Sequence, residues 1–232
     1  MVACGGGGSS SSTTPTETSV ELLPGGYATE IAFLDGSSVE AATLISPSGD
    51  FVVLVDFDDI TIGNLRIQSN GSVSGSGTDF YLDLDGFWQT QRGTLSGEVM
   101  SARKAMIKAT ATGYESRSTL ERDDQYSDLG VTFAELSGTY IMQTTGVYRT
   151  SVTILADGTI AGSDETGCAF NGSVAIPDTQ YNIYEVSYTA ANCREPQRNG
   201  QYSGLGAYDP DLVEIQFAGA NGEVAAFFIG AK

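Results

Sequence analysis

The feature of this sequence that most restricts its fold is a succession of short alternating apolar and polar runs, separated from residue 27 onward by Asx-Gly dipeptides. Such dipeptides suit hairpins, because a type I′ turn needs positive φ at both central residues. No segment keeps a helical period over three turns. The pattern predicts an all-β fold. The expected turns are Asp35-Gly36, Asn70-Gly71, Asp85-Gly86, Asp157-Gly158, Asn199-Gly200 and Asn221-Gly222.

An internal repeat divides the chain into two β units. The pattern of residues 65–76 recurs at 152–163, with Asn70-Gly71 answered by Asp157-Gly158. The charged stretch 121–128 interrupts the strand rhythm and predicts a boundary. We therefore expect a flexible N-terminal tether over 1–25, a first β domain over 26–130 and a second over 131–232. These are tandem small antiparallel units.

The second unit has enough strand segments to close on itself. Eight strands in about 100 residues suit an up-and-down barrel, which leaves no exposed sheet edge; an open sandwich is the alternative. The apolar segment 225–229 is expected to close the barrel. The strands are centred on Tyr140, Val152, Ile160, Phe170, Tyr184, Tyr202, Ile215 and Phe227.

The charge balance and one missing residue type exclude several functions. The chain has 29 acidic and 11 basic residues, a net charge of −18, and no histidine. Such a surface repels nucleic acid and attracts cations or basic proteins. Lacking histidine, the chain lacks the commonest general base and zinc ligand. We expect a non-enzymatic binding protein without a cofactor.

The N-terminus predicts a membrane anchor. Val2-Ala3-Cys4 resembles the end of a lipobox, the sequence cut before a cysteine that then carries lipid, palmitate included. The glycines and serines of 5–12 form a flexible tether. Gly5, rather than Asp, follows the cysteine, which favours the outer membrane. The alternative is an incidental cysteine before an expression linker, since the basic and apolar regions of a signal peptide are absent.

The other two cysteines, Cys168 and Cys193, flank a midpoint near Gln180, beside a turn signal at Pro177-Asp178. A hairpin there would bring the thiols together. In an exported protein this predicts a disulfide, and two buried free thiols are the alternative.

Two acidic clusters, over residues 56–59 and from Asp79 to Asp85, are the only candidates for a cation site. Calcium takes six to eight oxygen ligands, but neither cluster matches a known calcium loop, so a solvated acidic face is the alternative. Asp83 and Asp85 are expected on one strand face. Exposed tyrosines among Tyr181, Tyr184, Tyr188, Tyr202 and Tyr208 are a candidate recognition surface. The candidate cation ligands are Asp56, Asp58, Asp59, Asp83 and Asp85.

Seven matching segments carry a family resemblance: 69–74, 78–80, 136–140, 157–162, 167–172, 181–184 and Cys193. Through these segments the chain resembles a group of uncharacterised two-domain β-rich lipoproteins of proteobacteria. The resemblance implies two β domains, an intradomain disulfide and no activity. In architecture alone, the chain is distantly similar to transferrin-binding and factor-H-binding surface lipoproteins.

The functional expectation is a lipoprotein, attached to the bacterial outer membrane through lipid on Cys4, that presents an acidic barrel to a protein partner. That partner is expected to be basic, in the periplasm or at the cell surface. The alternatives are an inhibitor of a basic envelope-attacking enzyme such as lysozyme, and a structural subunit of an outer-membrane assembly or filament.

Overall fold

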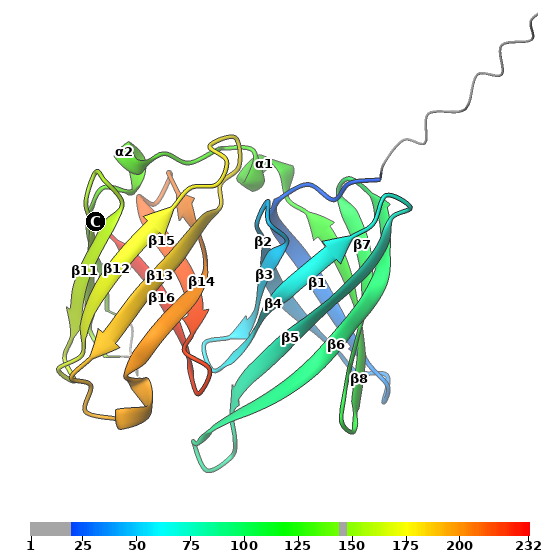
Figure 1. Cartoon of the computed structure of the whole chain (residues 1–232), viewed down its shortest axis with the longest axis horizontal. Coiled ribbons are helices and arrows are strands. Elements are labelled where there is room, and N and C mark those ends of the chain that lie inside the picture. The colour runs from blue at the N-terminus through cyan, green and yellow to red at the C-terminus, as the bar shows by residue number, and fades with distance from the viewer. Residues whose placement is uncertain (1–19, 144–147) are drawn as a thin grey trace, which may run out of the picture.

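The computed structural model describes residues 20–143 and 148–232. These form two tandem closed antiparallel barrels of eight strands each, joined by a helical connector (Figure 1). The predicted all-β class and the barrel in the second unit are confirmed. The expected Cys4 anchor lies outside the described residues.

The first barrel is a simple meander in which each strand pairs with the next, and β8 returns to β1. Its strands are β1 (Gly25–Phe33), β2 (Ser38–Ile45), β3 (Asp50–Asp56), β4 (Asp59–Ile67), β5 (Ser72–Leu82), β6 (Trp88–Ser101), β7 (Lys104–Ala111) and β8 (Tyr114–Arg122).

The second barrel has the same up-and-down order, and each expected strand centre lies in a strand. Within the described residues, β16 meets β9 at a single Cα pair, Ala231 with Ile141. The strands are β9 (Gly138–Met142), β10 (Thr150–Ile154), β11 (Thr159–Asp164), β12 (Ala169–Ala175), β13 (Tyr184–Ala191), β14 (Gly200–Asp209), β15 (Glu214–Ala220) and β16 (Ala225–Ala231).

Five of the six expected hairpin turns form, but by different chemistry. The Asx residues of these turns do not have positive φ; only the following glycines do, as at Gly36 and Gly71. The Asx oxygen instead accepts a backbone N–H two residues on: Asp35 Oδ1 from Ser37 and Asn70 Oδ1 from Ser72, both 2.9 Å. The type I′ prediction is therefore wrong.

Asn199-Gly200 is not a hairpin turn. Gly200 begins β14, and the β13–β14 connection contains the 3₁₀ helix η1 (Pro196–Arg198). The internal repeat also has a different meaning. It matches the β4–β5 hairpin with the β10–β11 hairpin, which occupy different places in the chain order of their barrels. The repeat therefore reflects a similar hairpin in each barrel, and the two barrels are not matched strand for strand by it.

The barrels are linked by a connector containing α1 (Asp124–Ser127) and α2 (Phe133–Leu136), and the expected boundary at 130/131 falls between these helices. Ser127 bonds to the backbone of Gly26 in the first barrel, and its carbonyl accepts the N–H of Asn182 in the second. The connector is therefore hydrogen-bonded to both barrels.

The outer faces of the barrels also pack against each other. Val52, Ile60 and Phe80 of the first barrel form one buried cluster with Ile183 and Leu205 of the second. Burial of apolar surface at this junction stabilises the paired arrangement at roughly 25 cal/mol per Å².

The predicted disulfide between Cys168 and Cys193 is present and lies within the second barrel. It ties the start of β12 to the segment after β13. Free buried thiols are thereby excluded. No helix in the described part of the chain has the length and apolar character needed to cross a membrane.

Candidate functional site

The interior of the first barrel contains a cavity of about 440 Å³. Side chains from all eight strands line it. Ligand pockets in proteins commonly enclose 300–1,000 Å³, so this space suits a small molecule. The cavity is lined entirely by residues that the structure describes.

One end of the cavity is closed. Leu22, Tyr27, Ile45 and Leu120 belong to a buried apolar cluster that fills this end, which we call the floor. The chain segment leading into β1 crosses here, where Leu23 donates its N–H to the carbonyl of Ala102 at 2.9 Å. Leu22 is 5% exposed, so this segment seals the barrel.

The other end, the mouth, is bordered by the β1–β2, β3–β4, β5–β6 and β7–β8 turns (Figure 1). Large apolar side chains stand exposed on two of these turns, β1–β2 and β5–β6. Leu34 is 77% exposed, Leu84 is 107% exposed and Phe87 is 65% exposed. An apolar rim around a cavity is typical of a site that receives apolar molecules.

Inward-facing glycines help to keep the interior open. Gly77 of β5 and Gly93 of β6 are paired in register and line the cavity. A Cβ on Gly77 would lie 3.1 Å from Phe51 Cζ, and one on Gly93 would lie 3.0 Å from the carbonyl oxygen of Thr110. Side chains at these positions would occupy the cavity, so the glycines maintain its width.

Two carboxylates face into the cavity near its mouth, Asp59 at the start of β4 and Asp79 in β5. Asp79 lies directly across from Thr61, whose hydroxyl donates to Asp79 Oδ1 at 2.7 Å. Among the residues lining the cavity there is no lysine or arginine. The interior therefore holds acidic groups with no basic side chain to balance them.

The environment of these groups disfavours negative charge. Burial, followed by repulsion from Asp79, Asp58 and Asp56, raises the pKa of Asp59 from 3.8 to about 6. Burial also raises the pKa of Asp79, and the hydrogen bond from Thr61 opposes that rise. A cation placed between the two carboxylates would relieve both penalties.

Aromatic rings lie beside the carboxylates. Tyr81 is the register partner of Asp59, and Tyr114 packs edge-on against Phe33 with ring centroids 6.1 Å apart. All three rings line the cavity. Burial raises the pKa of Tyr114, so its hydroxyl is neutral at physiological pH. Acidic and aromatic groups thus meet at the mouth of an apolar chamber.

The predicted acidic residues are separated by the fold. Asp59 enters the first barrel, whereas Asp56 and Asp58 are exposed. Asp83 and Asp85 are not on a strand, because β5 ends at Leu82. The expectation of a shared strand face is therefore wrong.

Asp83 instead organises the β5–β6 turn. Its Oδ1 accepts the N–H groups of Asp85 and Phe87 at 3.0 and 2.9 Å, and its Oδ2 accepts from Gln89 at 2.8 Å. These hydrogen bonds lower the pKa of Asp83, and the bond from the Phe87 N–H has the largest effect. Within residues 20–143 and 148–232, no group of three or more His, Cys, Asp or Glu side chains is arranged to hold a metal ion.

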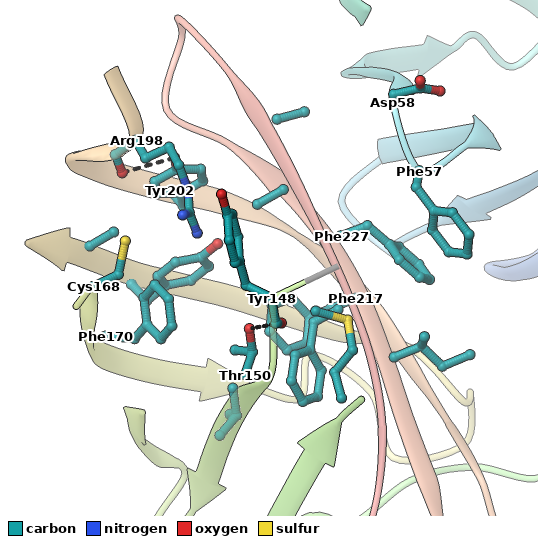
Figure 2. Close-up of a pocket in the computed structure, with 18 of the residues that line it drawn as sticks. Phe57, Asp58, Tyr148, Thr150, Cys168, Phe170, Arg198, Tyr202, Phe217 and Phe227 are labelled. Atoms are coloured by element: carbon teal, nitrogen blue, oxygen red, sulfur yellow. Dashed lines mark hydrogen bonds between the residues drawn. The ribbon is translucent and has the colours of Figure 1, made fainter. Parts of the chain in front are cut away.

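A second cavity, of about 530 Å³, borders β16 (Figure 2). Its lining comes from both sides of that strand: Tyr202 and Phe170 lie within the second barrel, and Phe57 and Phe227 lie outside it. The barrel interior is occupied by stacked rings, since Tyr188 and Tyr202 lie 4.9 Å apart and nearly parallel. No site is assigned there.

Of the five tyrosines expected at an aromatic surface, only Tyr181 is partly exposed. Tyr184, Tyr188, Tyr202 and Tyr208 are all buried in the second barrel, from 0% to 8% exposed. The hydroxyl of Tyr184 donates to the carbonyl of Gln216 at 2.9 Å. These tyrosines build the core, which is the commoner use of aromatic residues at alternating strand positions.

Sequence reasoning missed the inward-facing set of the first barrel: Thr61, Tyr81 and Tyr114 were not singled out, and Asp79 was grouped with the acidic stretch 79–85. A signal for part of it was present: successive strand residues face opposite sides, so Asp59 shares a face with Thr61, and Asp79 with Tyr81. Which face points inward depends on barrel closure, and the local pattern alone does not decide it.

No family model, curated protein or solved structure matches this chain.

Proposed function

We propose that this chain is a lipid-anchored envelope protein whose first barrel binds a small, largely apolar molecule. The cavity of about 440 Å³ carries this proposal. It combines a closed apolar floor, a few polar groups and an open mouth, which is the usual composition of a small-molecule site. Up-and-down barrels of eight strands have interiors wide enough for one small ligand.

Binding of a neutral fluorescent dye, N-phenyl-1-naphthylamine, tests the proposal. Ala109 lines the cavity opposite Leu95, and Ala109→Phe would place a ring inside it. We expect dye affinity to fall at least about tenfold, which corresponds to 1.4 kcal/mol. Thr94→Phe is the matched control, since Thr94 is exposed on the neighbouring strand β6. Equal dye affinity in A109F and wild type would refute cavity binding.

The anchor is supported by sequence alone, through Val2-Ala3-Cys4 and the Gly/Ser run behind it. Cys4 would carry the lipid, and the outer membrane is the proposed location. When the chain is exported in a bacterial host fed an alkyne palmitate analogue, label should enter the wild type and not Cys4→Ala. Label in the variant, or none in either, would exclude lipidation at Cys4.

A second candidate function is capture of a basic protein, such as an envelope-attacking hydrolase. The net charge of −18 and the exposed Leu84 and Phe87 on the β5–β6 turn favour it. Lysozyme activity on cell walls, measured with excess protein, provides the test. An unchanged rate of cell-wall hydrolysis would exclude inhibition of lysozyme by this protein.

A further inference from the structure

We infer that the first barrel selects an organic cation, a molecule with an amine or quaternary ammonium head and an apolar body. This inference rests on the proposed function, since it assigns the chemistry of the ligand in the same cavity. The head would lie between Asp59 and Asp79, and the body would extend toward the floor.

The charges in the cavity favour a cationic head. The described ion pairs include neither Asp59 nor Asp79. A carboxylate away from water needs a compensating partner. Thr61 supplies one hydrogen bond to Asp79, but this neutral hydroxyl does not balance the negative charge of the two carboxylates. The nearby Asp56 and Asp58 are exposed, so they remain in contact with solvent.

The aromatic groups favour an organic cation over a metal ion. Ammonium groups are attracted to the faces of aromatic rings, and Phe33, Tyr81 and Tyr114 line the same part of the cavity. Calcium would need six to eight oxygens. The described residues hold no group of three or more potential ligand side chains for a metal.

The remainder of the cavity favours an apolar body. Apolar side chains, including Ile31, Val53, Leu95 and Ile107, form much of the remaining wall. These side chains bury apolar surface without offering hydrogen bonds, so a hydrocarbon or aromatic ligand body would be stabilised by its removal from water. The ligand is thus an amphiphile with its cationic head at the mouth.

Three probes with the same hydrocarbon chain test this: decyltrimethylammonium, 1-decanol and decanoate, each titrated calorimetrically into the full-length protein below its micelle concentration. We expect decyltrimethylammonium to bind about tenfold more tightly than decanol, and decanoate more weakly than both. In Asp59→Asn/Asp79→Asn, the ammonium probe should lose this advantage while decanol affinity is retained. Unchanged decanol binding also shows that the variant is folded.

The outcomes separate this inference from the proposed function. If all three probes bind equally and A109F abolishes their binding, the cavity is a ligand site and selection of cations is wrong. If no probe binds, or A109F has no effect, both proposals fail. If calcium alone binds wild type and not the double Asn variant, the carboxylates form a metal site and the organic cation is wrong.

Discussion

The hydroxyl of Thr61 donates a 2.7 Å hydrogen bond to Asp79 across the β4–β5 pair. Among the described residues, Asp59 receives no comparable side-chain donor. This difference separates two carboxylates that face the same cavity. Asp79 keeps part of its hydrogen bonding on burial, whereas Asp59 is surrounded by other acids and carries the larger upward shift in pKa.

The first prediction concerns pH. Because the pKa of Asp59 rises from 3.8 to about 6 on folding, the folded state holds the proton more tightly between these values. Ionised Asp59 therefore destabilises the fold above pH about 6, and this penalty disappears as the pH falls toward 3.8. Asp59→Asn should raise the melting temperature at pH 8 and change it little at pH 4.

Asp85→Asn, at an exposed turn position, is the control for thermal melts followed by circular dichroism. It removes one negative charge of the same kind outside the cavity. An equal rise in melting temperature at pH 8 in both variants would mean that the effect comes from net charge and not from burial of Asp59.

The second prediction concerns the ion pair in the second barrel. Asp164 has a fully buried side chain and accepts a 2.5 Å hydrogen bond from Arg198 Nη2. Burial alone would raise the pKa of Asp164, but hydrogen bonds from Thr166 and Arg198 outweigh it and lower the pKa. Arg198→Ala should cost about 3 kcal/mol near neutral pH, because the carboxylate stays buried without its partner.

Chemical denaturation at pH 7 and at low pH measures this cost. The lowered pKa means that the wild-type benefit is present above the unfolded value of 3.8 and is lost as the pH falls below it. The difference in unfolding free energy between wild type and R198A should therefore become smaller at low pH. The exposed Arg194→Ala serves as control, and a gap independent of pH would argue against the ion pair.

The third prediction concerns the disulfide. The bond joins cysteines separated by 25 residues, and closing such a loop stabilises a protein by about 3 kcal/mol in the chain-entropy model. Cys168→Ala/Cys193→Ala should lower the unfolding midpoint accordingly. A reducing agent should lower the wild-type midpoint to a similar value and leave the variant unchanged. A reductant effect on the variant would point to another cause.

The fourth prediction concerns the junction of connector and second barrel. The amide of Asn182, fully buried, donates to the Tyr208 carbonyl at 2.7 Å and accepts the Tyr208 N–H at 3.0 Å. Asn182→Ala would leave both backbone groups unpaired and should cost about 2 kcal/mol. Asn171→Ala, at an exposed strand position, should cost far less in the same urea titration. Equal costs would contradict this role.

Much of the fold follows from local sequence. The alternation around Tyr140, Ile160 and Tyr202 places strands correctly, because half-buried strands must alternate. Cys168 and Cys193 could be paired because a hairpin brings its two ends together. These features depend on neighbours within about thirty residues of each other.

The site depends on longer-range relations. Asp59 becomes an interior residue only when β8 closes against β1, and nothing in residues 56–59 distinguishes it from the exposed Asp58. The buried Asn182 likewise has partners contributed by distant segments, including the Tyr126 carbonyl 56 positions earlier. Local periodicity identifies a strand, but barrel closure determines which side of it is the interior.

The crossing of the first barrel's floor by residues 20–24 gives the molecule a direction. The chain enters at the sealed end, and the cavity opens at the opposite end (Figure 1). In a protein held to a bilayer through Cys4, as proposed, the flexible tether would join the barrel at its sealed end and leave the opening unobstructed. A ligand could then enter or leave the cavity without passing the point of attachment.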